Sequence, residues 1–443
     1  MIPILITALD PFIRSGSAGT GPLFKAPWRR RITMALAAVV ILAGCAAPSS
    51  SVSSREVGAL VDPAALRKPA RSASAISETK AAYDLLHVFK LEPDGVDPTG
   101  LFVDGSGTIY GTTYGGGGAT SYGTVFKLEP TGKAYAFKSI YDFYGSNGEN
   151  PNPPVEDSDG NLYLTTLRGG AYSAGAAVKL SPSAKGYVQT AFYSFGSAGD
   201  GATPGAQFTL VGDTLYTTTA YGGKYGQGTL VAMSTKDLSE KGRYSFTSEI
   251  GELASTTLAS GSNGNLYGTA SGGPGGEGFV YEFPPDGKAP RPSIVYAFNL
   301  GSAAFSPVGD VAVDSYGNVY GTAFEGGASD CGAVFALSYA SGSYTLSLLH
   351  SFAGGNDGCF PQTNGIVLDG GLLAGATESG GADGNGTIFA LSTTGSNYAV
   401  VHVMKRTTGS WLTDLVPSGA SIYGTTQYGG PDSAGVVFRL TSR

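Results

Sequence analysis

The fold of this 443-residue chain is decided by one stretch, Ile109-Tyr110-Gly111-Thr112-Thr113, followed by Gly116-Gly117 and Gly123-Thr124-Val125-Phe126-Lys127-Leu128. The last copy reads Ile422-Tyr423-Gly424-Thr425-Thr426, Gly429-Gly430 and Gly435-Val436-Val437-Phe438-Arg439-Leu440. The tyrosine of the phrase recurs, with Ala374 in its place in the sixth copy, at Tyr110, Tyr163, Tyr216, Tyr267, Tyr320 and Tyr423. The spacings are 53, 53, 51, 53, 54 and 49 residues. A period near fifty residues with short strands is typical of propeller blades, so seven copies predict seven blades.

Each copy divides into four expected strands. In the second copy they lie near residues 154–157, 162–166, 177–180 and 190–195. Asp159-Gly160-Asn161 between the first two favours a tight hairpin turn, because these residues tolerate positive φ. The composition agrees, with 69 Gly, 25 Tyr and 21 Phe and only 14% charged residues. We therefore expect an all-β fold.

The two ends of the repeat region predict a closed ring. The final copy stops at Arg443, after its third strand, and lacks a fourth. The segment 85–90 resembles the fourth strand of another copy, 347–352, and the same Asp-Gly pair follows both. Pairing the spare strand with the incomplete blade removes both exposed edges. Residues 81–443 are thus predicted to form a seven-bladed β-propeller of four-stranded blades, in which the N-terminal strand completes the last blade.

The front of the chain is typical of an export signal. Basic residues (Lys25 and Arg29–Arg31) precede an apolar run at 32–43, which is too short for a permanent span. Leu42-Ala43-Gly44-Cys45 matches a bacterial lipobox, so residues 1–44 are predicted to be a lipoprotein signal peptide and Cys45 to be lipidated. The Ser/Ala-rich residues 45–80 are predicted to be a flexible tether. We expect the protein to be exported and anchored by lipid to the bacterial cell envelope, at the outer membrane or cell surface.

Charge excludes one class of partner. The formal net charge is −7, and removal of residues 1–44 takes it to −11, because five Lys/Arg and one Asp are lost. An acidic mature chain with no basic cluster does not fit nucleic-acid binding. The expected partners are the membrane, through the lipid anchor, and a carbohydrate or an envelope protein. We expect a monomer.

The repeat unit resembles the GloVer-type tandem repeat of bacterial extracellular proteins. The likeness rests on Tyr-Gly-Thr-Thr, Gly-Gly and Gly-Thr-Val-Phe-x-Leu, with Ser351-Phe352-x-Gly354-Gly355-x-Asp357-Gly358 after them, and covers residues 85–443. It implies export, surface anchoring and a propeller-like array, and no assigned reaction. Leu164 and Thr217 depart from the pattern, where they replace the glycine after the tyrosine.

Cysteine and histidine positions have structural interpretations. Cys331 and Cys359 fall in two loops that open on the same face of the predicted propeller, so an exported protein is expected to join them in a disulfide. The three histidines, His87, His350 and His402, share one register of the fourth strand, where other blades have tyrosine. Because that strand is outermost, the histidines are expected to pack between blades and not to form a shared metal site.

One face of the predicted ring is the candidate ligand face. Asn/Asp-Gly-x-x-Pro loops and Gly-Gly loops recur on it, and tyrosines lie on or beside it. Tyrosine with carboxylate suits sugars, whose rings stack and whose hydroxyls are hydrogen-bonded. The alternative is plain solvent-facing turns. The candidate residues are Asp94, Tyr114, Asn147, Tyr172, Asp200, Tyr221, Asp357 and Tyr428, with Tyr225 beside them.

No cofactor or metal site is expected, although calcium is an option at the acidic turns. Asp157-Ser158-Asp159-Gly160-Asn161 has part of the oxygen density of a calcium loop but lacks the downstream glutamate, so hairpin chemistry explains it better. The sequence contains no Gly-x-Ser-x-Gly elbow, no His-Glu-x-x-His pair and no phosphate-binding glycine loop.

The leading functional hypothesis is a non-catalytic binding module, and no catalytic residue is assigned. One alternative is a polysaccharide hydrolase or lyase, which predicts paired acids at the mouth of the central channel. The other is a purely structural or adhesive envelope protein, which predicts no saturable small ligand.

Overall fold

The computed structural model describes residues 81–117, 122–184, 186–247 and 256–441. The chain divides into two units, Met1–Arg67 and Lys68–Arg443, and all the described residues belong to the second. Their regular structure is thirty β-strands and one 3₁₀ turn, η2 (Gly355–Asp357). Within these ranges no helix is long and apolar enough to cross a membrane.

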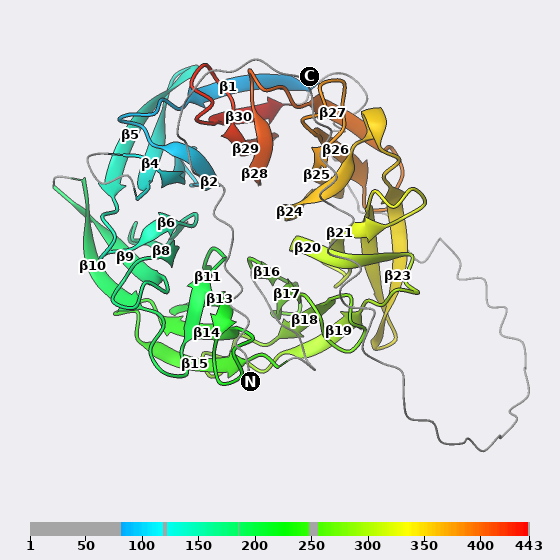
Figure 1. Ribbon diagram of the computed structural model, residues 1–443, viewed down its shortest axis with the longest axis horizontal. Helices are drawn as coiled ribbons and strands as arrows, with labels where there is room; N and C mark the ends of the chain where they lie inside the picture. The colour runs from blue at the N-terminus through cyan, green and yellow to red at the C-terminus, as the bar shows by residue number, and fades with distance from the viewer. Residues whose placement is uncertain (1–80, 118–121, 185, 248–255, 442–443) are drawn as a thin grey trace, which may run out of the picture. The chain divides into compact units, whose positions relative to one another are not determined.

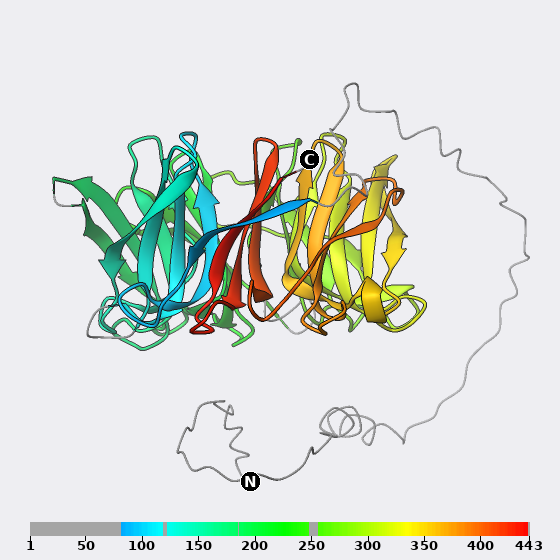
Figure 2. The ribbon, with the colours of Figure 1, turned by 90° about the horizontal axis from the view of Figure 1, so that it is seen from above.

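The strands form seven antiparallel sheets arranged in a ring, as Figure 1 shows in face view and Figure 2 in edge view. Each sheet is one blade, with its first strand near the axis and its fourth at the rim. Blade 1 contains β2 (Val96–Val103), β3 (Ile109–Gly115), β4 (Thr124–Thr131) and β5 (Ala134–Asp142). Blade 2 contains β6 (Glu149–Pro151), β7 (Val155–Glu156), β8 (Leu162–Arg168), β9 (Ala176–Ser183) and β10 (Gly186–Ser194). Blade 3 contains β11 (Gly201–Pro204), β12 (Thr209–Val211), β13 (Thr214–Gly222), β14 (Thr229–Ser234) and β15 (Glu240–Ser245).

The other four blades follow the same order from the axis outward. Blade 4 contains β16 (Ala259–Ser260), β17 (Leu266–Ala270), β18 (Phe279–Phe283) and β19 (Ser293–Ala297). Blade 5 contains β20 (Ala304–Val313), β21 (Val319–Gly326), β22 (Ala333–Ala340) and β23 (Ser343–Ser351). Blade 6 contains β24 (Cys359–Asp369), β25 (Leu372–Ser379), β26 (Thr387–Ser392) and β27 (Ala399–Val403). Blade 7 contains β28 (Ser410–Ser418), β29 (Ser421–Tyr428), β30 (Val436–Thr441) and β1 (Ala82–Val88).

Strand β1 closes the ring. It pairs antiparallel with β30, from Ala82 opposite Thr441 to Val88 opposite Val436. An Arg439–Asp84 ion pair of 2.9 Å crosses this junction, which joins the first and last strands of the propeller. The seven-bladed propeller and its closure by the N-terminal strand, both predicted from the sequence, are confirmed.

Within a blade, a small residue on the second strand makes room for an aromatic ring on the third. Gly111 lies opposite Phe126, and a side chain at Gly111 would overlap the phenyl ring. The same pairing joins Gly321 to Phe335, Gly375 to Phe389 and Gly424 to Phe438. The two blades that lack the glycine pair Leu164 with Val178 and Thr217 with Val231. The larger residue is therefore matched by a smaller partner, which conserves core volume.

Adjacent blades are connected where each first strand begins. Asp97, Asn150, Thr203, Ser306 and Phe360 have positive φ, and the backbone N–H of each donates to the preceding blade. A proline follows each of these five residues and packs against the glycine that ends the preceding blade's Gly-Gly loop; one such contact places Pro151 against Gly123. The apolar core likewise lies between blades, as in the cluster that holds Tyr267 of blade 4 and Phe335 of blade 5.

Candidate functional site

The polar residues of the Asn/Asp-Gly-x-x-Pro loops do not form a ligand face. Asp94, Asn147 and Asp200 are only 9%, 4% and 3% exposed. The side chains turn back to the fourth strand that precedes them: the Asp200 carboxylate accepts a 2.9 Å bond from the Tyr193 hydroxyl, and Asn147 donates to Tyr141 over 2.7 Å. The prediction that these three residues face a ligand is therefore wrong, because a buried polar group is held by its protein partner.

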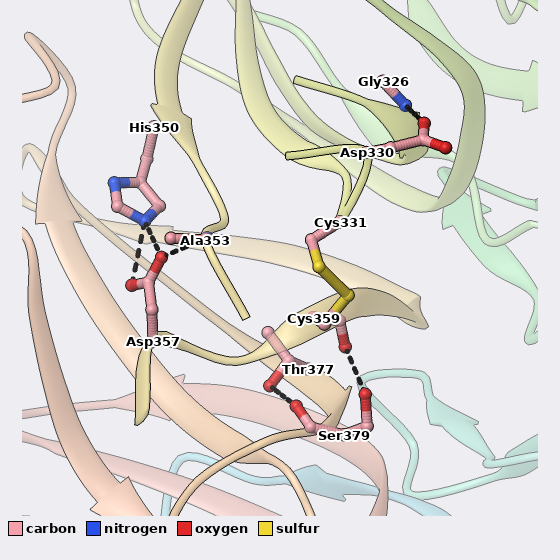
Figure 3. The surroundings of a disulfide bond; sticks show 9 residues. All are labelled: Gly326, Asp330, Cys331, His350, Ala353, Asp357, Cys359, Thr377 and Ser379. Carbon is pink, nitrogen blue, oxygen red and sulfur yellow. Dashed lines mark hydrogen bonds and ion pairs between the residues drawn. A yellow bond between two sulfur atoms is a disulfide. The ribbon is translucent and has the colours of Figure 1, made fainter. Parts of the chain in front are cut away.

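Asp357 also contacts the fourth strand that precedes it, and its partner on that strand is a histidine. Its two carboxylate oxygens lie 3.1 Å from His350 Nε2, and one of them accepts a 2.7 Å bond from the backbone of Ala353 (Figure 3). Asp94 contacts His87 in the same way over 3.2 Å. We call these four contacts, centred on Asp94, Asn147, Asp200 and Asp357, the rim latches. Each joins a fourth strand to the loop that leaves it.

The three histidines stack on the outer strand of the next blade. His350 lies 3.5 Å from the Tyr398 ring centre, and His402 lies 3.9 Å from that of Tyr83. His87 stacks on Phe137 in the same way. Burial lowers the pKa of His402 to about 4, so this ring is uncharged at neutral pH. No group of three or more His, Cys, Asp or Glu that could hold a metal occurs among the described residues.

The acidic turn proposed as a partial calcium loop is filled by protein donors. One oxygen of Asp157 accepts the backbone N–H groups of Asp159 and Asn161, both over 2.9 Å. The other accepts the Asn161 side chain and the Tyr163 hydroxyl, each over 2.8 Å. These contacts are those of a hairpin turn.

The tyrosines of the candidate face are exposed. All belong to the loops between second and third strands, or to the strand ends that lead into them, and we call this side of the ring the Gly-Gly face. Exposures range from 37% to 59%. The set spreads over four consecutive blades, 7, 1, 2 and 3, and consists of Tyr428, Tyr114, Tyr172, Tyr221 and Tyr225.

Cys331 and Cys359 are joined in a disulfide, with 4.6 Å between their Cα atoms. The bond connects the β21–β22 loop of blade 5 to the start of blade 6, as Figure 3 shows. Cys359 also accepts a 3.2 Å hydrogen bond at its carbonyl from Ser379 of the next strand. The bond thus adds a covalent link to a connection between blades that elsewhere consists of hydrogen bonds and proline packing. Cys45, the predicted lipidation site, lies outside the described residues.

A pocket of about 440 Å³ occupies the centre of the ring. Its described lining comes from blades 1 to 5 and blade 7, mainly from their first strands, and includes Ser271 at the base of the blade 4 Gly-Gly loop. Hydroxyl and amide side chains predominate in its lining, and many of them already bond to a neighbouring blade. Asn152, for instance, donates to the Pro204 carbonyl over 2.9 Å.

Two carboxyl groups, Asp310 of β20 and Asp414 of β28, also line this pocket. Asp310 accepts a 2.7 Å bond from the backbone of Thr257, and Asp414 accepts a 2.9 Å bond from Leu101. Burial raises the pKa of Asp310 to about 7. Burial, followed by repulsion from the Asp310 charge, does the same for Asp414. Two groups that titrate near neutrality in a pocket are a signature of functional sites.

The two acids occupy one position of the repeat, which the sequence analysis did not identify. Each lies two residues before the residue that pairs with the repeat tyrosine, since Ala312 pairs with Tyr320 and Val416 with Tyr423. In the other blades this position holds Gly100, Pro153, Gln207, Thr257 and Gly365. An alignment of the first strands would have found the acids, but these strands are the least alike of the repeat.

Comparison with known proteins places the repeat in a family. The model of the Gloeobacter/Verrucomicrobia repeat matches residues 73–275 and 255–443. No curated protein matches the chain. A crystal structure of a protein of unknown function from Dyadobacter fermentans is similar at 11% identity and a TM-score of 0.46, over 82% of this chain and 99% of that one. Since the repeat model covers most of its length, the chain belongs to the Gloeobacter/Verrucomicrobia repeat family.

Proposed function

We propose that the protein is an exported, lipid-anchored binding module of the bacterial cell envelope whose propeller binds carbohydrate on the Gly-Gly face. Export and anchoring rest on the sequence of residues 1–45. The Cys331–Cys359 disulfide supports them, because disulfides persist in oxidising compartments.

Carbohydrate binding rests on one observation, the row of exposed tyrosine rings on the Gly-Gly face of four consecutive blades, the face to which Ser271 of the central pocket belongs. Tyrosine presents a flat apolar surface with a polar tip, which suits the faces and hydroxyls of a sugar ring. The pocket adds hydroxyl and amide groups such as Thr99, Asn152 and Gln207. Its volume lies in the range of known ligand sites, roughly 300–1,000 Å³.

A glycan panel tests the proposal by the shift in melting temperature of the full chain. A ligand at a hundred times its Kd adds about 2.7 kcal/mol of stability, enough for a visible shift. Tyr172→Ala and Tyr221→Ala should each weaken binding several-fold. Tyr316→Ala is the matched control, because Tyr316 is as exposed but lies in the β20–β21 turn at the opposite end of the blade. A panel without a shift, or equal loss in all three variants, would point to a structural or adhesive role.

Replacement of Cys45 tests the anchor. Cys45→Ser removes the predicted acylation site, so the protein should move from the membrane fraction to the soluble exported fraction. An unchanged membrane fraction would contradict lipid anchoring. The glycan panel is independent of this result.

Cleavage of a glycan is a second candidate function, favoured by the convergence of Asp310 and Asp414 in the pocket. In such reactions a carboxylic acid with a raised pKa is the usual proton donor, and a second carboxyl group, once ionised, acts as base or nucleophile. New reducing ends would indicate a hydrolase, and new unsaturated ends a lyase. A glycan that binds and stays intact supports the binding module.

A further inference from the structure

The acids of the central pocket lack a compensating positive charge. Among the described residues that line it, none is Lys, Arg or His. One oxygen of each carboxylate accepts a backbone N–H of a neighbouring blade, from Thr257 at Asp310 and from Leu101 at Asp414. A buried charge without a partner is costly, so the pocket favours a ligand that brings positive charge.

Glycines border both acids at this level of the ring. Gly365 occupies the acid position in blade 6, between the blades that carry Asp310 and Asp414, and a Cβ there would come within 2.1 Å of the Asp310 carbonyl oxygen. On the far side of Asp414, Gly100 occupies the same position, and a Cβ there would come within 2.8 Å of the Asp414 carboxylate. The backbone of blades 6 and 1 thus approaches the acids closely, and both carboxyl groups line the pocket.

A buried hydroxyl provides a second, independent sign of a polar ligand. Tyr281 is fully buried, and its hydroxyl has no hydrogen-bond partner among the described residues. It points across the blade at Gly268, where a Cβ would come within 2.6 Å of the hydroxyl oxygen, and the next two residues, Thr269 and Ala270, line the pocket. Blades 1, 5, 6 and 7 have phenylalanine at this position.

The Tyr281 hydroxyl also lies within electrostatic reach of the acids. The charge of Asp310 raises the pKa of Tyr281, after the larger effect of burial. A phenol next to a carboxylate stays neutral and can donate or accept a hydrogen bond. Two carboxylates thus line the pocket, and one neutral hydroxyl lies behind its wall, next to the strand β17 that carries Thr269 and Ala270 and within reach of the Asp310 charge.

We propose that the central pocket binds the protonated amine of an amino sugar, with Asp310 and Asp414 as its carboxylate partners. This inference rests on the carbohydrate binding proposed above and adds the substrate class. An ammonium group has three donors and no acceptor, which matches two carboxylates and a neighbouring hydroxyl or carbonyl oxygen. Most Thr, Asn and Gln side chains of the lining already donate to neighbouring blades, as Thr99 does to the Pro151 carbonyl, so their oxygens offer acceptor positions to the sugar hydroxyls.

Other ligand classes fit this pocket less well. An anionic sugar would meet two carboxylates and no cation. Calcium takes six to eight oxygen ligands, commonly with several carboxylates. Here only two carboxylates are present, and each already accepts a backbone N–H.

Calorimetric titration of the full chain with glucosamine, glucose and N-acetylglucosamine tests the inference. The three probes share a ring, and only glucosamine carries a protonated amine. Glucosamine should bind at least about tenfold more tightly than the others, since hydrogen bonds to charged groups contribute about 1.5–3 kcal/mol. Asp310→Asn and Asp414→Asn should each remove that preference. Asp383→Asn, an exposed acid in the blade 6 Gly-Gly loop, should keep it.

A competition measurement on the unaltered protein covers the case in which an Asn variant fails to fold. Methylammonium should displace glucosamine, whereas sodium at the same concentration should not. Equal affinity for the three sugars, or no competition by methylammonium, would overturn the amine site. If neutral glycans still bound and depended on Tyr172, the proposed function would stand without it. If no sugar bound at all, both proposals would fall.

Discussion

Acidic side chains occur in two regions of the propeller, at the rim latches and in the central pocket, and the two groups differ in their partners. Asp94, Asp200 and Asp357 recur from blade to blade, and each meets a His or Tyr of its own fourth strand. Asp310 and Asp414 occur in two blades only and face each other's charge. In a repeat protein, a polar residue that recurs at one position stabilises each blade. A polar residue that occurs at that level in only a few copies indicates a functional site.

The largest effect should come from breaking a rim latch. Asp200→Ala removes the acceptor of Tyr193 and of the Gly201 backbone and leaves Arg243 with one carboxylate fewer. We expect a loss of about 3 kcal/mol, because the change strands buried donors. Urea unfolding measures it, with the exposed Asp383→Ala as control, which should stay within about 0.5 kcal/mol. An equal loss of stability in the two variants would mean that the acids of the rim latches contribute no more than an exposed acid.

The next largest effect on stability should come from the recurring glycine–phenylalanine pair of the second and third strands. Gly111→Leu places a side chain where the Phe126 ring lies and should destabilise the protein by about 2 kcal/mol. Adding Phe126→Val copies the Leu164/Val178 pair of blade 2 and should recover most of that loss. Thermal unfolding of the single and double variants checks this. A double variant no more stable than the single one would mean that the two positions do not share one volume.

The two pocket acids should make the free energy of unfolding fall as the pH rises. Their folded pKa values are about 7, whereas an unfolded Asp titrates near about 3.9. Between these values the folded state holds more protons, so stability is present at low pH and is lost as pH rises through 7. Asp310→Asn and Asp414→Asn should each be about 1–2 kcal/mol more stable than the parent at pH 8 and equal to it at pH 4. Unfolding curves at several pH values measure this, and a pH-independent difference would contradict it.

The smallest effect on stability should come from the exposed tyrosines. Tyr172→Ala and Tyr221→Ala should change the free energy of unfolding by less than about 0.5 kcal/mol, because neither ring is buried. Any loss of glycan binding in these variants is then a loss of contact and not of fold. A large drop in melting temperature would instead assign the rings to blade packing.

The sequence predicts the ring well because its period, turns and incomplete ends are local patterns. Seven tyrosine-centred copies and a spare strand at residues 85–90 leave few alternatives. It predicts polar side chains poorly, because a loop aspartate can face solvent or the preceding strand. The seven-residue spacing from His87 to Asp94, Tyr193 to Asp200 and His350 to Asp357 was the available signal for the latches.

The pocket acids were missed for a different physical reason. The first strands contain β-bulges, such as the register shift between Leu412 and Asp414, so their positions do not align by counting from the Gly-Gly loops. The pairing partners on the second strand restore the alignment. Only the three-dimensional register shows that Asp310 and Asp414 share one level of the ring with Gly365.

Closure by β1 also sets an order of events during synthesis. Strand β1 pairs with residues 436–441, which are synthesised long after it, and Asp84 meets Arg439 across 355 positions of sequence. Blades 1 to 6 each draw all their strands from a continuous stretch and can form as they appear. Blade 7 cannot, because its outermost strand has no partner until β30 has been made. A closed ring therefore shows that synthesis has passed residue 441, since without β30 the strand β1 has nothing to pair with.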